Sequence, residues 1–537
     1  MNRRQFLRTA VVLSGAAAVG GCGSAGGSAG GSARLLAPSD PRVAEREAAR
    51  AAGNVVQIAL RAAEGEVDLG GRVVRSWTYG SVPGKPIRVR RGDVLVATLD
   101  NRLPDSTSVH WHGLALRNDM DGMPPVTQSH IPAGTSFTYR YIADRPGTYW
   151  FHPHTGTQLD RGLYAAMIVE DPDERVAYDD EWVVVLDDWL DGTGRTPEDI
   201  LAELRTGMGH HHEGHDGHDM DGMHDMAGMD MAGMDHGAAP ASASASAPTP
   251  AAGVGGNPAG MLMGAVSSLL GGDAGDVSYP YHLLNGRVAT DPEVYRAKPG
   301  RRVRIRVVNA GSDTGYRFAV GGHTLTVTHT DGYPVAPVET DSVLIGMGER
   351  YDVVVTLKDG VFPVVALAEG KNALARALIR TGAGRPPAAG ARPAELARRV
   401  TSSGDLAATP EVALPRRGVD REYRLELTGG MAQYDWGING VRFDHEKPLL
   451  AEPFLVSQGE RVRLTFANKG KMWHPMHLHG HTYQVGTSGP RKDTVIVLPK
   501  REVVCEFDAD NPGRWMVHCH NTYHAESGMM RVLGYTG

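Results

Sequence analysis

Four pairs of histidines, each with one residue between its members, are the residues of this sequence best suited to chemistry. Because side chains alternate between the two faces of a strand, both imidazoles of a pair project from the same face of an extended segment. Imidazole is a frequent ligand of copper and zinc. Eight converging imidazoles would bind more than one metal ion. The pairs are His110 and His112, His152 and His154, His477 and His479, and His518 and His520.

A second metal site is indicated by residues that face the other way. Cys519 lies between His518 and His520, so on a strand it points away from both. His474 lies three residues before His477, so on a strand it also points away from the third pair. His524 and Met529 follow Cys519 by five and ten residues, where the strand would turn back. One thiolate, two imidazoles and a long thioether bond are the ligands of blue-copper electron-transfer sites. The candidate set is His474, Cys519, His524 and Met529.

Three similar segments, spread along the chain, predict the elements that position these residues. Each begins with Gly, has apolar residues three, five and seven positions later, and has Asn at the ninth position. They span 92–101, 300–309 and 459–468. An apolar period of two predicts a half-buried strand, and three copies predict three β-sandwich domains.

Composition agrees with a β protein and excludes several classes. The 537 residues include 68 Gly and 33 Pro, which favour strands and turns over helices. The formal charge of −7 offers no basic surface for nucleic acid, and the only long apolar run lies at the N-terminus. Three cysteines cannot form a disulfide framework, and Cys505, which lacks ligand-type neighbours, is assigned to the core.

The N-terminal segment predicts export. Residues 1–22 resemble a twin-arginine signal that ends in a lipoprotein cleavage box, with Arg3-Arg4 followed by a short apolar stretch and Cys22. Acylated Cys22 would be the only membrane anchor, and residues 23–53 a tether. We therefore expect an extracytoplasmic lipoprotein, with an incidental Cys22 in a secreted protein as the alternative.

Composition shifts predict the domain limits. The expected domains span 54–172, 180–380 and 419–537, with an insert at 207–260 and a linker at 381–418. Thr196, followed by Ile200, Leu201 and Leu204, predicts a short capped helix before the insert.

Four motifs and their spacing resemble the copper signatures of the three-domain multicopper oxidases. They are His110-Trp111-His112-Gly113, Trp150-Phe151-His152-Pro153-His154, His474-Pro475-Met476-His477-Leu478-His479-Gly480-His481, and His518-Cys519-His520 through His524 to Met529. Met120-Asp121-Gly122-Met123-Pro124 and Arg491-Lys492-Asp493-Thr494-Val495 also resemble the family. The resemblance runs from about residue 54 to the end and is strongest to the copper-tolerance branch of mycobacteria and related actinobacteria. It implies an all-β chain of three consecutive cupredoxin-like domains.

The resemblance also implies a role for each candidate ligand. It assigns type 1 copper, the point of electron entry, to His474, Cys519, His524 and Met529. It assigns type 2 copper to His110 and His477, and the type 3 pair to His112, His152, His154, His479, His518 and His520. Four copper ions would then store four single-electron oxidations and reduce O2 to water. The complete ligand set argues against a two-domain nitrite reductase and against a copper-free scaffold.

Two acids are candidates for proton delivery. Asp121 matches an acid that the family is thought to use near the type 2 copper, with a simple turn at Asp121-Gly122 as the alternative. Many relatives place a second acid directly after the type 1 His, whereas here Ala525 stands there. Glu526 follows one position later and is the weaker candidate.

The segment Met208–His236 bears on the substrate. It contains seven Met, seven His and seven acidic residues, and thioethers with imidazoles select Cu(I) over hard cations. A Met stripe on a buried helix is the alternative, but the intervening Gly and Asp disfavour that helix. Met472 matches a substrate-copper position of the family, although Gly470 stands where a partner acid is expected and Asp435 or the acids of the insert would have to replace it. The candidate substrate-copper residues are Met472, Met220, Met223, Met226, Met229, Met231 and Met234.

Three functions remain open from the sequence. The first is oxidation of Cu(I) to Cu(II) with O2 for copper tolerance. The second keeps the same copper sites but oxidises phenols, aromatic amines or Fe(II). The third, of another class, is a copper-sequestering lipoprotein. The expected partners are O2 and a small reductant, with no nucleic acid, and the expected state is a monomer.

Overall fold

The computed structural model describes residues 34–206, 258–445 and 452–537. The predicted signal peptide with Cys22 and the segment Met208–His236 with its methionines lie outside the described residues. Leu35–Gly537 form one compact unit.

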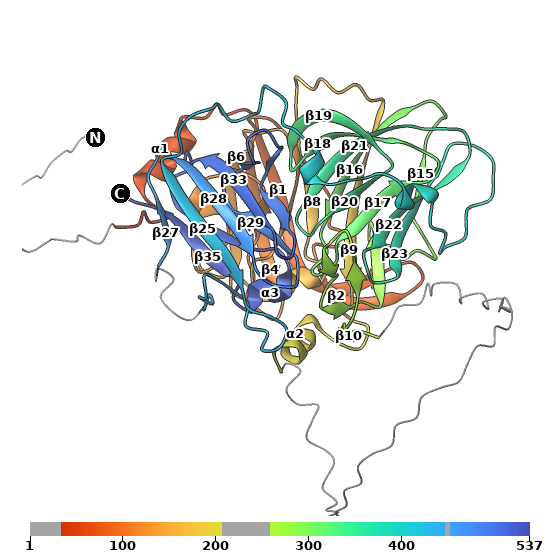
Figure 1. Cartoon of the computed structure of the whole chain (residues 1–537), viewed down its shortest axis with the longest axis horizontal. Coiled ribbons are helices and arrows are strands. Elements are labelled where there is room, and N and C mark those ends of the chain that lie inside the picture. Colours follow the sequence, from red (N-terminus) through yellow and green to blue (C-terminus); the bar gives the residue numbers. More distant parts are fainter. Residues whose placement is uncertain (1–33, 207–257, 446–451) are drawn as a thin grey trace, which may run out of the picture. The chain divides into compact units, whose positions relative to one another are not determined.

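Nearly all of the regular structure is strand, arranged as three two-sheet sandwiches that follow one another along the chain (Figure 1). This confirms the predicted all-β fold. In the first sandwich, sheets ordered β2-β1-β4-β6 and β3-β8-β7-β5 enclose a core that includes Trp111, Tyr139 and Phe151. Its strands are β1 (Val55–Asp68), β2 (Val73–Thr78), β3 (Ile87–Arg90), β4 (Val94–Arg102), β5 (His110–His112), β6 (Ser136–Ile142), β7 (Gly147–His152) and β8 (Ala165–Glu170).

The second sandwich has two sheets of six strands, ordered β14-β9-β16-β21-β18-β19 and β15-β23-β22-β17-β20-β24. Its strands are β9 (Asp180–Trp189), β14 (Tyr281–Leu284), β15 (Val294–Arg296), β16 (Arg302–Asn309), β17 (Tyr316–Val320), β18 (Leu325–Thr330), β19 (Tyr333–Thr340), β20 (Ser342–Ile345), β21 (Arg350–Thr356), β22 (Val361–Ala368), β23 (Ala373–Arg380) and β24 (Val400–Thr401). β24 belongs to the segment 381–418, so part of the predicted linker completes a sheet of the second sandwich.

The third sandwich has sheets ordered β26-β25-β28-β33-β30-β31 and β27-β35-β34-β29-β32. Its strands are β25 (Arg421–Thr428), β26 (Gly437–Ile438), β27 (Phe454–Val456), β28 (Arg461–Asn468), β29 (His474–Leu478), β30 (Tyr483–Val485), β31 (Arg491–Lys492), β32 (Thr494–Val497), β33 (Glu502–Asp508), β34 (Arg514–Cys519) and β35 (Met530–Tyr535). The short helix α3 (Thr522–Glu526) joins β34 to β35.

The three repeated segments are the strands β4, β16 and β28, which confirms that prediction. Each pairs in parallel with the first strand of its own sandwich, β1, β9 or β25. The Asn that ends each repeat is buried, and in all three its side-chain amide donates to two backbone carbonyls and accepts from the N–H two residues later. Because buried polar backbone groups need partners, this Asn satisfies the turn that leaves each strand.

Residues 35–50, which lie in the stretch that we expected to be a tether, instead pack on the sandwiches. Helix α1 (Pro41–Ala48) is capped by Asp40, and Val43 is buried beneath it. Just before it, the N–H of Leu36 donates to the carbonyl of Tyr535 at 2.8 Å. Arg46 on the helix donates to the carbonyl of Asp510 at 2.5 Å and to that of Ala115 at 3.2 Å. This segment therefore joins the first sandwich to the third.

The predicted capped helix before the insert is α2 (Pro197–Thr206). Thr196 and Asp199 cap it reciprocally, with bonds of 2.9 and 3.2 Å. Ile200, Leu201 and Leu204 are buried in the core of the third sandwich. After the insert, β10 (Gly260–Met261) pairs with β13 (Val277–Ser278), and β11 (Val266–Ser267) pairs with β12 (Gly272–Asp273). In Figure 1, α2 and β10 lie beside each other and close to α3.

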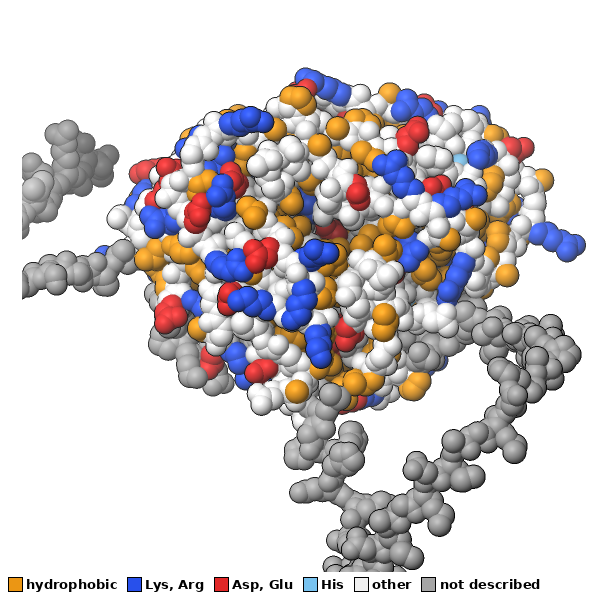
Figure 2. Space-filling model, in the orientation of Figure 1, with side chains coloured by type: hydrophobic (Ala, Val, Ile, Leu, Met, Phe, Trp, Pro, Cys, Tyr) orange, Lys and Arg blue, Asp and Glu red, His pale blue; other side chains and the backbone are white. Residues whose placement is uncertain are grey.

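Charged side chains of both signs alternate on the face shown in Figure 2. On the third sandwich they form pairs across strands, such as Arg424 with Glu502 at 2.5 Å and Arg463 with Glu506 at 2.7 Å. Local pairing of this kind leaves no extended basic area on this face. No helix in the described part of the chain is long and apolar enough to cross a membrane.

Candidate metal centres

The four histidine pairs lie on or directly after neighbouring strands of two sandwiches. In the first sandwich, β5 pairs with β7 so that His110 stands opposite His152. In the third, β29 pairs with β34 so that His477 stands opposite His518. The second member of three pairs, His154, His479 and His520, follows its strand directly rather than lying within it. All eight imidazoles are buried and meet at the boundary between the two sandwiches.

Within this cluster the imidazole nitrogens gather in sets drawn from both sandwiches. Nε2 of His518 lies 3.0 Å from Nε2 of His479 and 3.4 Å from Nε2 of His154. Nε2 of His520 lies 3.2 Å from Nδ1 of His112, and His152 lies beside both rings. The remaining two, His110 and His477, have ring centres 5.8 Å apart.

The hydrogen bonds of the rings show that the inward nitrogens carry lone pairs. Nδ1 of His518 donates to the carbonyl of Cys519, and Nδ1 of His479 donates to the carboxylate of Asp121. In a neutral imidazole the other nitrogen is then an acceptor. The two Nε2 atoms at 3.0 Å thus have no proton to share, which is the arrangement of two ligands of one metal ion.

Three further rings follow the same rule. Nδ1 of His110, His152 and His477 donates to a backbone carbonyl at 2.9 Å. Their Nε2 atoms are buried and have no hydrogen-bond partner among the described residues. Unpartnered buried acceptors are costly unless something else binds them, so the donor set fits copper ions.

Burial favours the neutral form of six of the eight rings, and the neutral form is the one that binds a metal ion. Loss of solvent, and then the neighbouring imidazoles, hold the pKa of His152, His154, His479, His518 and His520 well below the usual value. Burial and His477 do the same for the pKa of His112, against the opposing effect of Asp493.

The second predicted set also comes together. Sγ of Cys519 lies 3.7 Å from Nδ1 of His474 and 3.7 Å from Nδ1 of His524, and these two nitrogens are 3.1 Å apart. All three side chains are buried. Met529 is buried in the same hydrophobic cluster, and its backbone pairs with that of Cys519. Cys505 lies in this core as expected, on β33.

Nε2 of His524 donates to the carboxylate of Asp276 at 2.9 Å, which directs Nδ1 toward the sulfur. Asp276 precedes β13, belongs to the middle part of the chain, and also accepts from the hydroxyl of Tyr434 at 2.7 Å. The indole of Trp436 covers the other side of His524, with ring centres 4.2 Å apart. A buried carboxylate and an aromatic ring thus fix the orientation of this histidine.

Asp493 fixes two histidines of the cluster. Its carboxylate accepts from Nε2 of His112 at 3.0 Å, and its carbonyl accepts from Nδ1 of His477 at 2.9 Å. Arg350, on β21 of the second sandwich, donates to both carboxylate oxygens at 2.6 and 2.7 Å. Burial alone would raise the pKa of Asp493, but Arg350 and the histidine hydrogen bonds hold it well below the usual range. The second sandwich therefore supports a site whose histidines come from the other two.

Asp121 is buried and touches histidines of both sandwiches. Its carboxylate accepts from His479 at 2.9 Å, and its carbonyl accepts from His110. The next residue, Gly122, has φ +78°, and a Cβ there would lie 1.7 Å from the carbonyl oxygen of Val109. Asp121 therefore forms the tight turn with Gly122 and also contacts the histidines. Its role as a turn residue is compatible with its role as a candidate proton donor.

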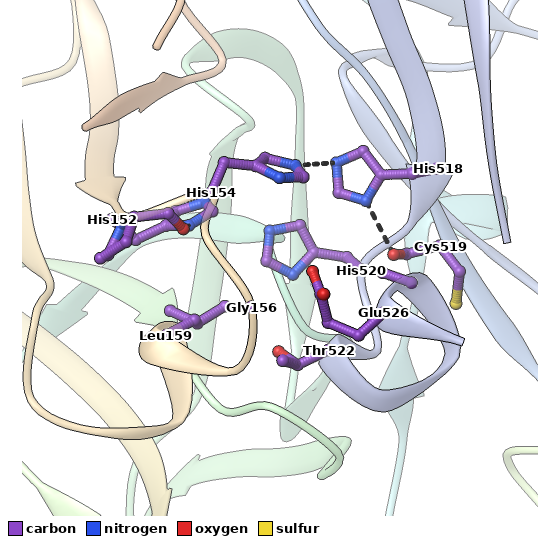
Figure 3. A pocket seen from close by; sticks show the side chains of 11 residues that line it. His152, His154, Gly156, Leu159, His518, Cys519, His520, Thr522 and Glu526 are labelled. Carbon is purple, nitrogen blue, oxygen red and sulfur yellow. Dashed lines mark hydrogen bonds between the residues drawn. The ribbon is translucent and has the colours of Figure 1, made fainter. Parts of the chain in front are cut away.

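Glu526 lines a small pocket beside the cluster, together with His152, His154, His518 and His520 (Figure 3). The carboxyl group points from α3 toward the histidines in this view. Burial raises the pKa of Glu526, which favours the protonated form. Its carboxylate also lies 3.8 Å from Nε2 of His445.

Met472 is only 3% exposed and lies in the hydrophobic cluster that contains Cys519 and Met529. Its backbone pairs with that of Asp273 at the end of β12, so an acid stands beside Met472 although Gly470 does not supply one. Asp435 is partly buried on the segment before β26.

Multicopper oxidase family models match residues 62–174, 180–384 and 417–536. A multicopper oxidase of Mycobacterium tuberculosis, MmcO, is 45% identical over 99% of this chain and 97% of its own length. The chain belongs to the multicopper oxidase family. The oxidase is also 27% identical to a copper resistance protein A homologue of Pseudomonas syringae pv. tomato, over 88% of this chain and 91% of that protein.

Solved structures show the same fold at lower identity. The laccase of Botrytis aclada has a TM-score of 0.68 at 23% identity and covers 91% of the oxidase and 89% of its own chain. Fet3p, a multicopper oxidase that functions in iron import, has a TM-score of 0.67 at 20% identity, with 90% of each chain covered.

Sequence reasoning did not identify the supporting residues Arg350 and Asp276. Asp493 lies in the segment Arg491-Lys492-Asp493-Thr494-Val495, and the resemblance of this segment to the family was the only indication of its importance. Arg350 and Asp276 lie in the middle part of the chain and belong to no recognisable motif. Nothing in the local sequence of the oxidase therefore indicates their role.

Proposed function

We propose that this oxidase couples the one-electron oxidation of Cu(I) to the four-electron reduction of O2 to water, and that it serves copper tolerance. We assign type 1 copper to His474, Cys519, His524 and Met529, type 2 copper to His110 and His477, and the type 3 pair to the other six histidines. Copper bound in these four positions would accept single electrons at Cys519 and deliver four of them to O2 at the histidine cluster.

One observation supports coupling above the others. Cys519 faces His474 and His524, while its chain neighbours His518 and His520 face the histidine cluster. A single stretch of backbone thus connects the candidate electron entry to the candidate oxygen site. Since these residues are buried, electrons can pass between the sites without exposure of either to solvent.

Protons must reach the same cluster. Burial raises the pKa of Glu526, which favours a proton on this carboxyl group beside the histidines. Asp121 lies in direct contact with His479 and His110 on another side of the cluster. We propose that these two carboxyl groups deliver protons to oxygen.

The surroundings of Cys519 support Cu(I) as the substrate. Helix α2 packs Ile200, Leu201 and Leu204 into the hydrophobic cluster that contains Cys519 and Met472. The Met/His/Asp segment follows α2 directly in the sequence, and Arg205 at the end of α2 donates to the carbonyl of Glu526 at 2.5 Å. The C-terminal end of α2, the last described part of the chain before this segment, therefore lies next to the candidate copper centres. The copper resistance names of two relatives agree with this substrate.

We propose that Asp273 replaces the acid missing at Gly470. Its backbone pairs with that of Met472, and its partly buried carboxyl has a pKa raised by desolvation, so a bound cation would compensate its burial. A thioether and a carboxylate together would receive Cu(I) close to His474.

The deciding experiment measures O2 consumption by the copper-loaded oxidase with Cu(I) and with a phenol, before and after deletion of Met208–His236. We expect Cu(I) to be the better substrate and the deletion to lower only that rate. Asp273→Asn should raise the KM for Cu(I) about tenfold or more, and Asp435→Asn, the matched control, should not. A faster phenol reaction that the deletion leaves intact or increases would replace Cu(I) oxidation by a laccase function.

Export by the twin-arginine route, a lipid anchor on Cys22 and a monomeric state also remain proposals, as do the domain limits 54–172, 180–380 and 419–537. Cys22→Ala should release the oxidase from the membrane fraction of expressing cells. Sedimentation of the purified protein should give the mass of one chain.

A further inference from the structure

A polar cavity of about 310 Å³ lies where all three sandwiches meet the segment that connects the second to the third. Arg145 of the first sandwich, Tyr333 of the second and Arg491 of the third line it, together with residues 411–415. None of the described residues that line this cavity is a candidate copper ligand, so the cavity is separate from the copper centres.

Two guanidinium groups lie against one aromatic ring in this cavity. The guanidinium carbon of Arg145 is 5.7 Å from the ring centre of Tyr333, and that of Arg491 is 5.1 Å from it. Each cation is attracted to the ring, but the two cations repel each other. Burial and the charge of Arg145 both act to lower the pKa of Arg491.

Neither guanidinium has a carboxylate partner within 4.0 Å in the described parts of the chain. Arg491 donates to the carbonyls of Val412 and Thr482 at 3.1 and 2.9 Å, and its Nε is buried without a partner. Arg145 makes no hydrogen bond to any described residue through its side chain. A buried donor such as Nε of Arg491 normally finds an acceptor, whereas Arg145 is only half-buried.

Three acids line the cavity, and each lies beside another arginine; Glu411 is 3.2 Å from Arg175. Asp508 pairs with Arg461 at 2.9 Å and with Arg417 at 2.6 Å. Asp510 lies 3.9 Å from Arg46 of helix α1. Arg145 and Arg491 therefore have no carboxylate within 4.0 Å among the described residues, although Asp510, which is farther away, acts to raise the pKa of both.

We propose that this cavity binds one small tetrahedral oxyanion, of the phosphate or sulfate class, between Arg145 and Arg491. The planar fork of a guanidinium matches two oxygens of such an anion, and the volume admits it with water. An anion bound there joins the first sandwich to the third and removes the repulsion between the two cations. It is a structural ligand of the junction, separate from the copper centres.

The test is calorimetric titration of the full-length, copper-loaded oxidase with inorganic phosphate, sulfate or chloride at constant ionic strength. We expect phosphate or sulfate to bind with a stoichiometry of one per chain, and chloride to bind at least tenfold more weakly. Arg145→Gln should weaken oxyanion binding at least tenfold, and Arg145→Lys less. Arg140→Gln, an exposed arginine of β6, is the matched control and should leave binding unchanged.

A second measurement does not depend on the folding of a variant. Crystals of the unaltered oxidase soaked in selenate should show an anomalous peak between Arg145 and Arg491. Equal binding of chloride and phosphate, binding that Arg145→Gln leaves intact, or a selenate-soaked crystal without density in this cavity would each overturn the proposal.

Discussion

Arg350 and Asp493, from the second and third sandwiches, form a fully buried ion pair with two parallel hydrogen bonds of 2.6 and 2.7 Å. This pair supports His112 and His477, so the sandwich that supplies no histidine to the cluster still controls its geometry.

Arg350→Leu should therefore damage both stability and metal binding. Removal of one partner leaves a buried carboxylate without its counter-charge, a change that typically costs about 3–5 kcal/mol. We expect a lower unfolding midpoint and fewer copper ions per chain, measured by calorimetry and metal analysis. Arg350→Lys retains the charge but not the two parallel hydrogen bonds, so its unfolding midpoint and copper content should lie between those of Arg350→Leu and the parent. Arg140→Leu, the control, should match the parent in both. A full copper complement in Arg350→Leu would contradict this account of the pair.

Cys519→Ser should abolish oxidation of every donor and leave the copper of the histidine cluster in place. Serine is a poor copper ligand, whereas the eight imidazoles are untouched. The comparison is Cys505→Ser, which makes the same chemical change in the core of the same sandwich. It should keep the blue absorption and the activity, with some loss of stability. Cells that carry Cys519→Ser but stay copper tolerant would favour sequestration over oxidation.

Glu526→Gln should slow O2 reduction by about 10²-fold without loss of copper. An amide keeps the shape of the side chain, but its N–H groups are not acidic enough to transfer a proton, and a general acid typically contributes about 10²–10⁴-fold. Steady-state O2 consumption and metal analysis check both parts. Glu422→Gln, on the exposed edge of β25, is the control. An unchanged rate in Glu526→Gln would remove Glu526 from the proton path.

Acid should weaken the contact between the first two sandwiches through Asp352. Burial alone would raise the pKa of Asp352, but Arg304 and Arg306 outweigh it and hold the pKa well below the usual value. A group with a depressed pKa stabilises the fold above its unfolded pKa of about 3.9, and this contribution is lost as pH falls toward the folded value.

Asp352→Asn should accordingly lower the unfolding midpoint at pH 7, and the difference from the parent should shrink below about pH 4. Asp352 also accepts from Thr148 of the first sandwich at 2.7 Å, so Thr148→Val is the variant to compare. It should cost less, because it removes one neutral hydroxyl, which donates to Asp352 and accepts from Arg306, and leaves both arginines paired with Asp352. A pH-independent difference for Asp352→Asn would show that its charge is unimportant.

Much of the site could be predicted from local sequence. The spacing of the histidine pairs and the parity of Cys519 act over a few residues, so a strand pattern suffices to place them on one face or the other. The repeat of Gly, alternating apolar residues and Asn likewise predicted β4, β16 and β28, because each repeat forms its own strand and turn.

The supporting contacts could not be predicted because they join distant segments. Arg350 reaches Asp493 across 143 positions and Asp276 reaches His524 across 248 positions, and neither has a local pattern. Helix α1 was missed for a different reason. Its cap at Asp40-Pro41 was readable, but the Gly/Ser-rich stretch before it suggested a continuous tether, and the docking of Val43 depends on surfaces far along the chain.

His112 and His520 approach to 3.2 Å although 408 positions separate them. Cys519 and the last histidines of both candidate centres lie within residues 518–529, after all the other candidate ligands in the sequence. A chain that stops before His518 keeps the histidines of the first sandwich but lacks ligands of both candidate centres. Such a truncated chain is thus expected to bind neither set of copper ions completely and to have no path for electrons between them.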